Sequence, residues 1–235
     1  MQTAVGTRRA RSTFVAVKQG DSDDPLVLSY LGLRKIVGII GFALPIVLIL
    51  GKMLLQGGGI EDSISAYYYT DLGGWFVGSL CAIGVFLLST RGYDVRDAIA
   101  GRLACAFAVT VAMFPTTPPA SYTCTAVSAS ISKIHWASAA LLFATLAYFC
   151  LMLFTETDKT RPRSRRKAAR NLLYRVCGGL IIVSILSIGT IKFVPSIGTG
   201  LAGCSPVFWL ESLAVFSFAV AWLTKGEMIL KDGQA

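Results

Sequence analysis

The sequence predicts an all-α fold: a polytopic transmembrane bundle of six helices whose N- and C-termini both lie in the cytoplasm. Three observations lead to this prediction: the composition, the lengths of the apolar stretches and the distribution of lysine and arginine. Hydrophobic residues make up 54% of the 235 residues and charged residues only 15%, and the mean hydropathy is +0.64. A soluble globular domain carries about 25% charged residues. A disordered chain has low hydrophobicity. The composition therefore excludes both classes.

Six stretches are long and apolar enough to be transmembrane helices. A helix needs about 20 predominantly apolar residues to cross about 30 Å of hydrocarbon. The stretches are continuously apolar and do not alternate in polarity, which excludes the strands of a membrane barrel. Each is bounded by charges, prolines or polar residues. The predicted spans cover about residues 36–55, 74–90, 99–115, 134–154, 176–195 and 208–224.

The basic residues predict the orientation, because the cytoplasmic loops of membrane proteins are enriched in lysine and arginine. With the N-terminus inside, 19 of the 22 Lys and Arg residues fall in cytoplasmic segments. The other three, Lys52, Lys133 and Lys192, fall on the external side. An even number of spans then places the C-terminus inside as well.

The chain divides into three parts by composition. Residues 1–24 are basic and lack the apolar run of a signal peptide, so we expect a disordered cytoplasmic arm. Residues 25–227 form the six-helix transmembrane domain, and residues 228–235 form a short cytoplasmic tail. The apolar segment Pro25–Leu33 either lies in the membrane interface or lengthens the first helix, and the sequence does not separate these alternatives.

The net charge of +9 is explained by topology and lipid contact, without a nucleic-acid partner. The densest basic cluster, Arg161–Lys167, lies between two predicted spans on the cytoplasmic side. Basic residues in such loops set the topology and meet anionic lipid head groups. We therefore expect membrane lipids as partners, with anionic head groups at this loop. For a bacterial protein, the predicted location is the inner cell membrane.

Small residues indicate where helices approach each other closely. Gly38 and Gly41 lie in the first predicted span, and Gly74–Gly78 in the second matches GxxxG. Such spacings allow the backbones of neighbouring helices to come close together. We expect these glycines to pack within the bundle.

Polar residues gather in the loop between the first two predicted spans. Residues 57–71 contain three acids, two serines and three consecutive tyrosines, Tyr67–Tyr69. In one interpretation, the tyrosines form an aromatic belt at the membrane interface. In the other, the loop folds back over the helices and lines a pocket.

Two ionisable residues favour a pocket: Glu211 near the start of the sixth span and His135, the sole histidine, at the start of the fourth. An ionisable side chain within a span is costly unless it is paired or hydrated, so it marks a functional site by default. If both helix faces point inward, these two side chains approach each other. For Glu211, a structural polar lock between helices is an equal alternative. The predicted ligand-binding residues are Ser65, Tyr68, Asp71, His135 and Glu211.

The sequence predicts no catalytic residue, metal site or cofactor. One histidine cannot complete a three-histidine zinc site or a bis-histidine haem site. The sequence contains no HExxH, Walker A, GxSxG or CxxC motif. Cys124 and Cys204 fall in two different external loops and form a candidate disulfide if that side is oxidising.

Several motifs resemble those of a group of uncharacterised bacterial six-span integral membrane proteins. They are Ser63–Thr70 (SISAYYYT), Gly74–Ser79, Leu88–Asp94, Phe114–Thr117, His135–Trp136 and Trp209–Ser212. The resemblance covers about residues 36–227, and the motif of the first external loop is its most specific part. In layout, the chain is also distantly similar to DRAM and Sfk-type membrane proteins. The resemblance implies a helical bundle of that type and brings no established catalytic residues.

The sequence thus predicts an integral membrane protein that binds a lipid or small solute in a polar pocket open to the external side. Tyrosine and serine would donate hydrogen bonds there, and Glu211 and His135 would supply charge or a proton. One alternative is a proton-coupled small-solute transporter, which should show mid-membrane helix breaks at Pro45 or Gly178–Gly179. Another is a membrane-embedded lipid hydrolase, which requires Ser65 or a bound metal beside a base.

Overall fold

The computed structural model describes residues 25–89, 95–119, 122, 127–156, 165–201 and 203–230. Within these ranges the chain is helical and contains no strand, as the predicted all-α class requires. The predicted basic arm at residues 1–24, residues 161–164 of the basic cluster Arg161–Lys167 and residues 231–235 of the predicted tail lie outside the described residues.

Each of the six apolar stretches lies for most of its length in a described helix. These helices are α1 (Pro25–Gln56), α2 (Gly73–Leu88), α3 (Val95–Met113), α4 (Ala129–Tyr148) continued by the π-helical turn η2 (Phe149–Leu153), α5 (Arg165–Phe193) and α7 (Pro206–Lys225). Two short elements, the 3-10 helix η1 (Ser65–Tyr69) and the helix α6 (Pro195–Gly200), lie in the connections. Helix α1 begins at Pro25, so the apolar segment Pro25–Leu33 lengthens the first helix.

Four helices are long and apolar enough to cross a membrane. They contain the segments Leu31–Gln56, Ala129–Leu153, Arg165–Phe193 and Pro206–Lys225. Helix α2 is apolar but has only 16 residues. Helix α3 has 19 residues and carries three charged side chains in its first half: Arg96, Asp97 and Arg102. Length and composition therefore identify a membrane protein from these four helices.

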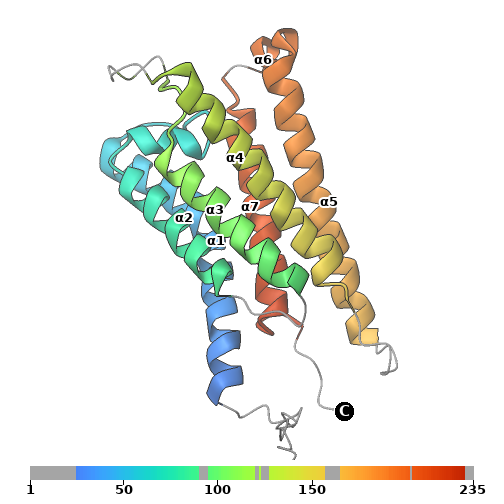
Figure 1. The fold of residues 1–235 in the computed structure, drawn as a ribbon. Helices are drawn as coiled ribbons and strands as arrows, with labels where there is room; N and C mark the ends of the chain where they lie inside the picture. Colours follow the sequence, from blue (N-terminus) through green and yellow to red (C-terminus); the bar gives the residue numbers. More distant parts are fainter. Residues whose placement is uncertain are drawn as a thin grey trace, which may run out of the picture.

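The helices pack in the order α1, α2, α3, α4, α5 and α7, and α7 packs back against α1. Figure 1 shows α7 running through the middle of the bundle, behind α3 and α4. Helix α7 is correspondingly the most buried of the four long apolar helices. We call the end of the bundle that carries η1 and α6 the cap end. Both α4 and α7 begin at the cap end, and α5 terminates there.

Gly38 and Gly41 of α1 lie in close contact with α7, as the prediction that they pack within the bundle requires. A Cβ atom built on Gly38 would lie 2.6 Å from Cγ of Leu223, and one on Gly41 would lie 3.5 Å from Cβ of Ala219. The prediction for the GxxxG motif is wrong, because a Cβ on Gly74 or Gly78 meets no atom within 4 Å. The spacing of a motif does not say which face of a helix meets a neighbour.

An aromatic cluster joins α4, α5 and α7 at the end opposite the cap. The Trp222 ring lies 5.0–5.3 Å from the rings of Phe149, Phe154 and Phe218. Tyr174 of α5 packs edge-on against Phe154 at 5.3 Å. Such ring pairs stabilise a core beyond the area they bury. Helices α4 and α5 are therefore held together here, and Figure 1 shows them diverging toward the cap end.

Replacing Gly38 with alanine should destabilise the bundle, because the added Cβ would also lie 3.1 Å from the backbone nitrogen of Leu223. Overpacking costs about 1–3 kcal/mol, so we expect a lower midpoint of thermal unfolding in detergent micelles. Gly32→Ala in the same helix is the matched control, since a Cβ there meets nothing within 4 Å. Equal midpoints for the two variants would contradict the close contact between α1 and α7.

Candidate functional site

The connection between α1 and α2, residues 57–72, folds back over the bundle, and we call it the cap. Its side chains Ile64, Ala66 and Leu72 are buried, and Tyr67 is fully buried against the ring of Phe208. Burial raises the pKa of the Tyr67 hydroxyl, so this group stays protonated. The tyrosine-rich loop is expected either to form an aromatic belt or to fold back over the helices, and the burial of Tyr67 agrees with a loop that folds back.

Two hydrogen bonds attach the cap to the start of α7. The Phe208 N–H donates to the backbone carbonyl of Asp62 at 3.0 Å. The Ile64 N–H donates to Oε2 of Glu211 at 2.6 Å, and the Glu211 side chain is buried. A hydrogen bond between a backbone N–H and a carboxylate is stronger than one between neutral groups. Glu211 therefore acts as a polar lock between the cap and α7.

Other polar contacts attach the cap to its remaining neighbours. Glu61 of the cap forms an ion pair with Lys52 of α1, and both side chains are largely buried. The Tyr122 hydroxyl donates to the same Glu61 carboxylate at 2.6 Å. The Tyr69 hydroxyl donates to the Thr116 carbonyl, beyond the end of α3. The cap is thus bonded to α1, to α7 and to the connection between α3 and α4.

A cavity of about 1090 Å³ lies beneath the cap, between α4 and α5. Its apolar part is formed by small and large side chains of these two helices, among them Phe143, Ile185 and Leu186. Its walls also include Glu211 of α7 and residues of the cap. Small-molecule sites have volumes of about 300–1,000 Å³, so this cavity has room for a ligand of that size or larger.

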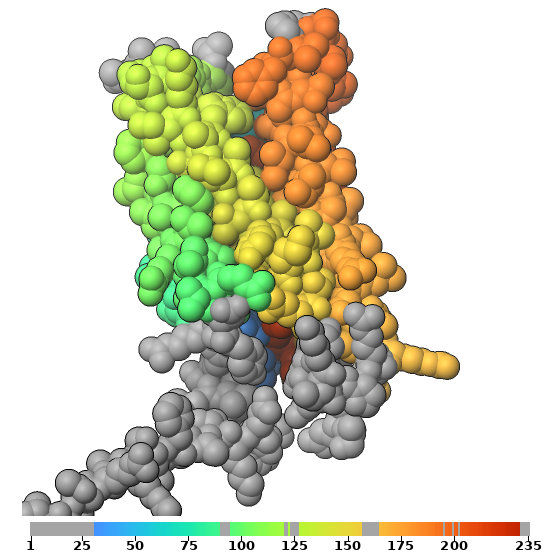
Figure 2. Space-filling view, turned by 45° about the vertical axis from the view of Figure 1, so that its right-hand side comes forward, coloured from blue at the N-terminus to red at the C-terminus, as the bar shows by residue number. Residues whose placement is uncertain are grey.

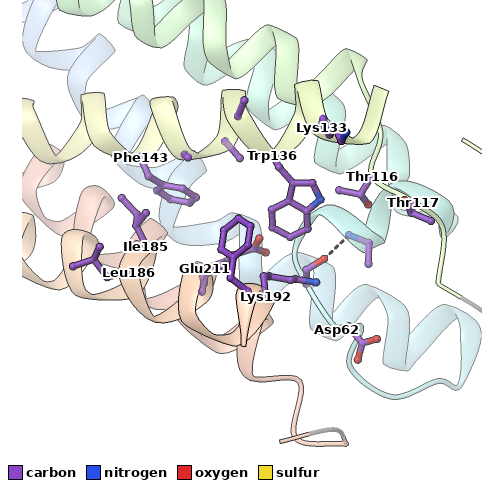
Figure 3. Close-up of a pocket in the computed structure, with 18 of the residues that line it drawn as sticks. Asp62, Thr116, Thr117, Lys133, Trp136, Phe143, Ile185, Leu186, Lys192 and Glu211 are labelled. Atoms are coloured by element: carbon purple, nitrogen blue, oxygen red, sulfur yellow. Dashed lines mark hydrogen bonds between the residues drawn. The ribbon is translucent and has the colours of Figure 1, made fainter. Parts of the chain in front are cut away.

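Polar side chains gather at one end of the cavity. Figure 3 shows Asp62, Thr116, Thr117 and Lys133 at the end opposite the apolar side chains, with Lys192, Trp136 and Glu211 between the two groups. An elongated cavity with one apolar and one polar end matches the shape and polarity of an amphipathic molecule.

The ammonium group of Lys192 is positioned by an aromatic ring. Its Nζ lies 4.7 Å from the centroid of the Trp136 ring, a cation–π contact between α5 and α4. It also attracts the carboxylate of Glu211 electrostatically. The Lys192 side chain is exposed and lines the cavity. Trp136 also lines the cavity.

The cavity opens sideways between α4 and α5. Figure 2 shows a hollow between these two helices in the half of the molecule toward the cap end, with atoms of other helices visible at its base. Leu186 and Phe193 line the cavity and are 65% and 87% exposed. The exposed apolar rim faces the surroundings of the bundle, which for a membrane protein are lipid chains.

Of the five predicted ligand-binding residues, the structure places Glu211 on the cavity wall and the other four elsewhere. The Ser65 hydroxyl lies 3.2 Å from that of Ser63 within the cap. Tyr68 packs edge-on against Tyr69. Asp71 is exposed and lines a separate groove between α1 and α2, together with Gly74 and Gly78.

His135 and Glu211 have different hydrogen-bond partners. Nδ1 of His135 lies 2.6 Å from the Phe114 carbonyl oxygen, and the ring is almost completely buried and does not line the cavity. Glu211 instead bonds to the cap. The expected approach of the two side chains is therefore replaced by two separate contacts with backbone groups.

Sequence reasoning missed the contribution of Lys133, Thr116 and Thr117 to the polar end. The sequence contained one signal for Lys133: only three basic residues are predicted on the external side, and Lys133 and Lys192 are two of them. The Thr117 hydroxyl donates to the Ser132 hydroxyl at 3.2 Å, which attaches the connection between α3 and α4 to α4 beside the cavity.

Within the described residues, no group of three or more His, Cys, Asp or Glu side chains is placed to hold a metal ion. Cys204 is exposed and forms no disulfide in that part of the chain. Its suggested partner, Cys124, lies outside the described residues. The disulfide stays a prediction.

Comparison of the chain with known protein families, with curated proteins and with solved structures finds no match.

Replacing Glu211 with alanine should loosen the cap, because the buried Ile64 N–H then loses its acceptor. An unpaired buried donor costs about 1–3 kcal/mol. At about 1.4 kcal/mol per factor of ten, amide exchange at Ile64 should quicken by roughly tenfold or more. Hydrogen–deuterium exchange of the cap peptide measures this.

Ser212→Ala is the matched control for that experiment. Ser212 is the next residue of α7, and its buried hydroxyl makes no hydrogen bond within the described structure. Its removal should leave cap exchange unchanged. If Glu211→Ala and Ser212→Ala gave the same exchange rate, the role of Glu211 as a lock would be wrong.

Proposed function

We propose that this protein binds a lipid or small amphipathic solute in the cavity between α4 and α5, at the external face of the membrane. The observation that carries the proposal is the cavity itself, which is apolar between the helices, polar beneath the cap and open sideways. These are the features that an amphipathic ligand needs in a site reached from a bilayer.

The proposed topology has six transmembrane helices, both termini in the cytoplasm and the cap outside, in the inner membrane of a bacterial cell. Helices α2 and α3 pack side by side between α1 and α4, as two further spans would. The distribution of lysine and arginine supports this orientation. The cytoplasmic basic loop then meets anionic head groups, and membership of the six-span group that the motifs resemble is part of the same proposal.

Binding is favoured over transport by the continuity of the helices. Substrate sites of transporters are typically built where helices are broken near the middle of the membrane. Helix α1 runs through Pro45 without interruption, and α5 runs through Gly178 and Gly179. Binding is favoured over lipid hydrolysis because Ser65 pairs with Ser63 rather than with a base.

Filling the cavity should displace the ligand. Gly189 of α5 lines the cavity, and a Cβ there meets nothing within 4 Å, so Gly189→Phe places a ring in free space. We expect the affinity for co-purified or added lipid to fall about tenfold or more, a loss of about 1.4 kcal/mol. Native mass spectrometry of the protein released from mild detergent measures the lipid that is retained.

The matched control for this substitution is Gly179→Phe. Gly179 lies in the same helix, also has open space at its Cβ position and does not line the cavity. It should retain lipid as the unmodified protein does. If both phenylalanine variants retain as much lipid as the unmodified protein, the cavity is not the binding site.

A further inference from the structure

We infer that the ligand is a phospholipid with a zwitterionic head group that carries a phosphate and a primary ammonium, as in phosphatidylethanolamine. This inference rests on the proposed function and names the ligand class of the same cavity. It is carried by the charges at the polar end and by the side opening.

The charged side chains that line the cavity are balanced in sign. Among the described residues they are two cations, Lys133 and Lys192, and two acids, Asp62 and Glu211. They come from four different elements: α4, α5, the cap and α7. Their convergence on one cavity is produced by the fold and not by neighbouring positions in the sequence.

The exposure of these groups suits a head group at the membrane surface. Lys133, Lys192 and Asp62 are exposed, so a head group can reach them from the membrane surface, whereas Glu211 is buried in the cavity wall. The cap hydrogen bond of Asp62 uses its backbone carbonyl, so its side-chain carboxylate is not needed to hold the cap on α7. Asp62 can therefore be changed without removing that bond.

A head group with charges of both signs matches this arrangement. A phosphate accepts hydrogen bonds from the ammonium groups of Lys133 and Lys192, and these charge-assisted bonds are strong. A primary ammonium has three N–H donors, which suit the carboxylates of Asp62 and Glu211. A purely anionic head group leaves the two acids facing a like charge, which is costly.

The acyl chains have an apolar path between α4 and α5. Phe143 and Ile185 lie at the far end of the cavity from Asp62 and Lys133, and the exposed Leu186 and Phe193 form its rim. A lipid of the external leaflet can therefore enter sideways, with its chains remaining in apolar surroundings and its head group remaining at the polar end.

The inference is tested by titrating delipidated full-length protein in detergent with dioleoyl phosphatidylethanolamine and, separately, with dioleoyl phosphatidylglycerol. Native mass spectrometry gives the occupancy of each. The two lipids share the phosphate and the chains but differ in the ammonium. We expect phosphatidylethanolamine to bind about tenfold more tightly to the unmodified protein.

Substitutions separate the contributions of the two charges. Asp62→Asn should weaken phosphatidylethanolamine binding about tenfold and remove the preference, whereas Lys192→Gln should weaken the binding of both lipids. Asp71→Asn is the matched control, because Asp71 is also exposed at the cap end but lines the separate groove. It should leave both affinities unchanged.

Failure of this inference differs from failure of the proposed function. Equal affinity for the two lipids, or an unchanged preference in Asp62→Asn, overturns the zwitterionic head group while Gly189→Phe still reduces binding. Displacement of the lipid by equimolar soluble glycerophosphoethanolamine overturns the requirement for acyl chains. Loss of any effect of Gly189→Phe overturns the cavity as the site and, with it, the proposed function.

Discussion

The backbone N–H of Ile64 donates to the buried carboxylate of Glu211, and the position of the cap on the bundle depends on this bond. Without an acceptor, this buried N–H is left unsatisfied, so losing the carboxylate weakens the attachment of the cap to α7 while the other cap contacts remain. The cap forms part of the cavity lining beside Glu211. Glu211 therefore both attaches the cap to α7 and lines the cavity.

The cavity follows from unequal contact between α4 and α5 along their length. Near η2 the helices are close, because a Cβ on Gly178 would lie 2.5 Å from Cγ of Leu151. The aromatic rings around Trp222 fix the same end. Toward the cap the two helices separate, and small residues such as Gly189 leave the space unfilled. Close packing at one end thus produces an opening at the other, which is where the charged side chains converge.

The sequence predicted the helices well because a long apolar run can satisfy its backbone in a membrane only by forming one. It also identified Glu211, since an ionisable group inside a span is unusual. It did not reveal the partners of Glu211 and His135, because both bond to backbone groups, and backbone groups leave no pattern in a sequence. The convergence of Lys133 and Asp62 was hidden for a related reason, since it depends on how the cap folds back.

The most direct measurement is a high-resolution density map of the protein in a lipid nanodisc, inspected between α4 and α5 beneath the cap. Binding of a phospholipid predicts elongated density along Phe143 and Ile185 that ends in a head group beside Lys192 and Asp62. A cavity containing only water, or helices α4 and α5 closed against each other at the cap end, would contradict the account.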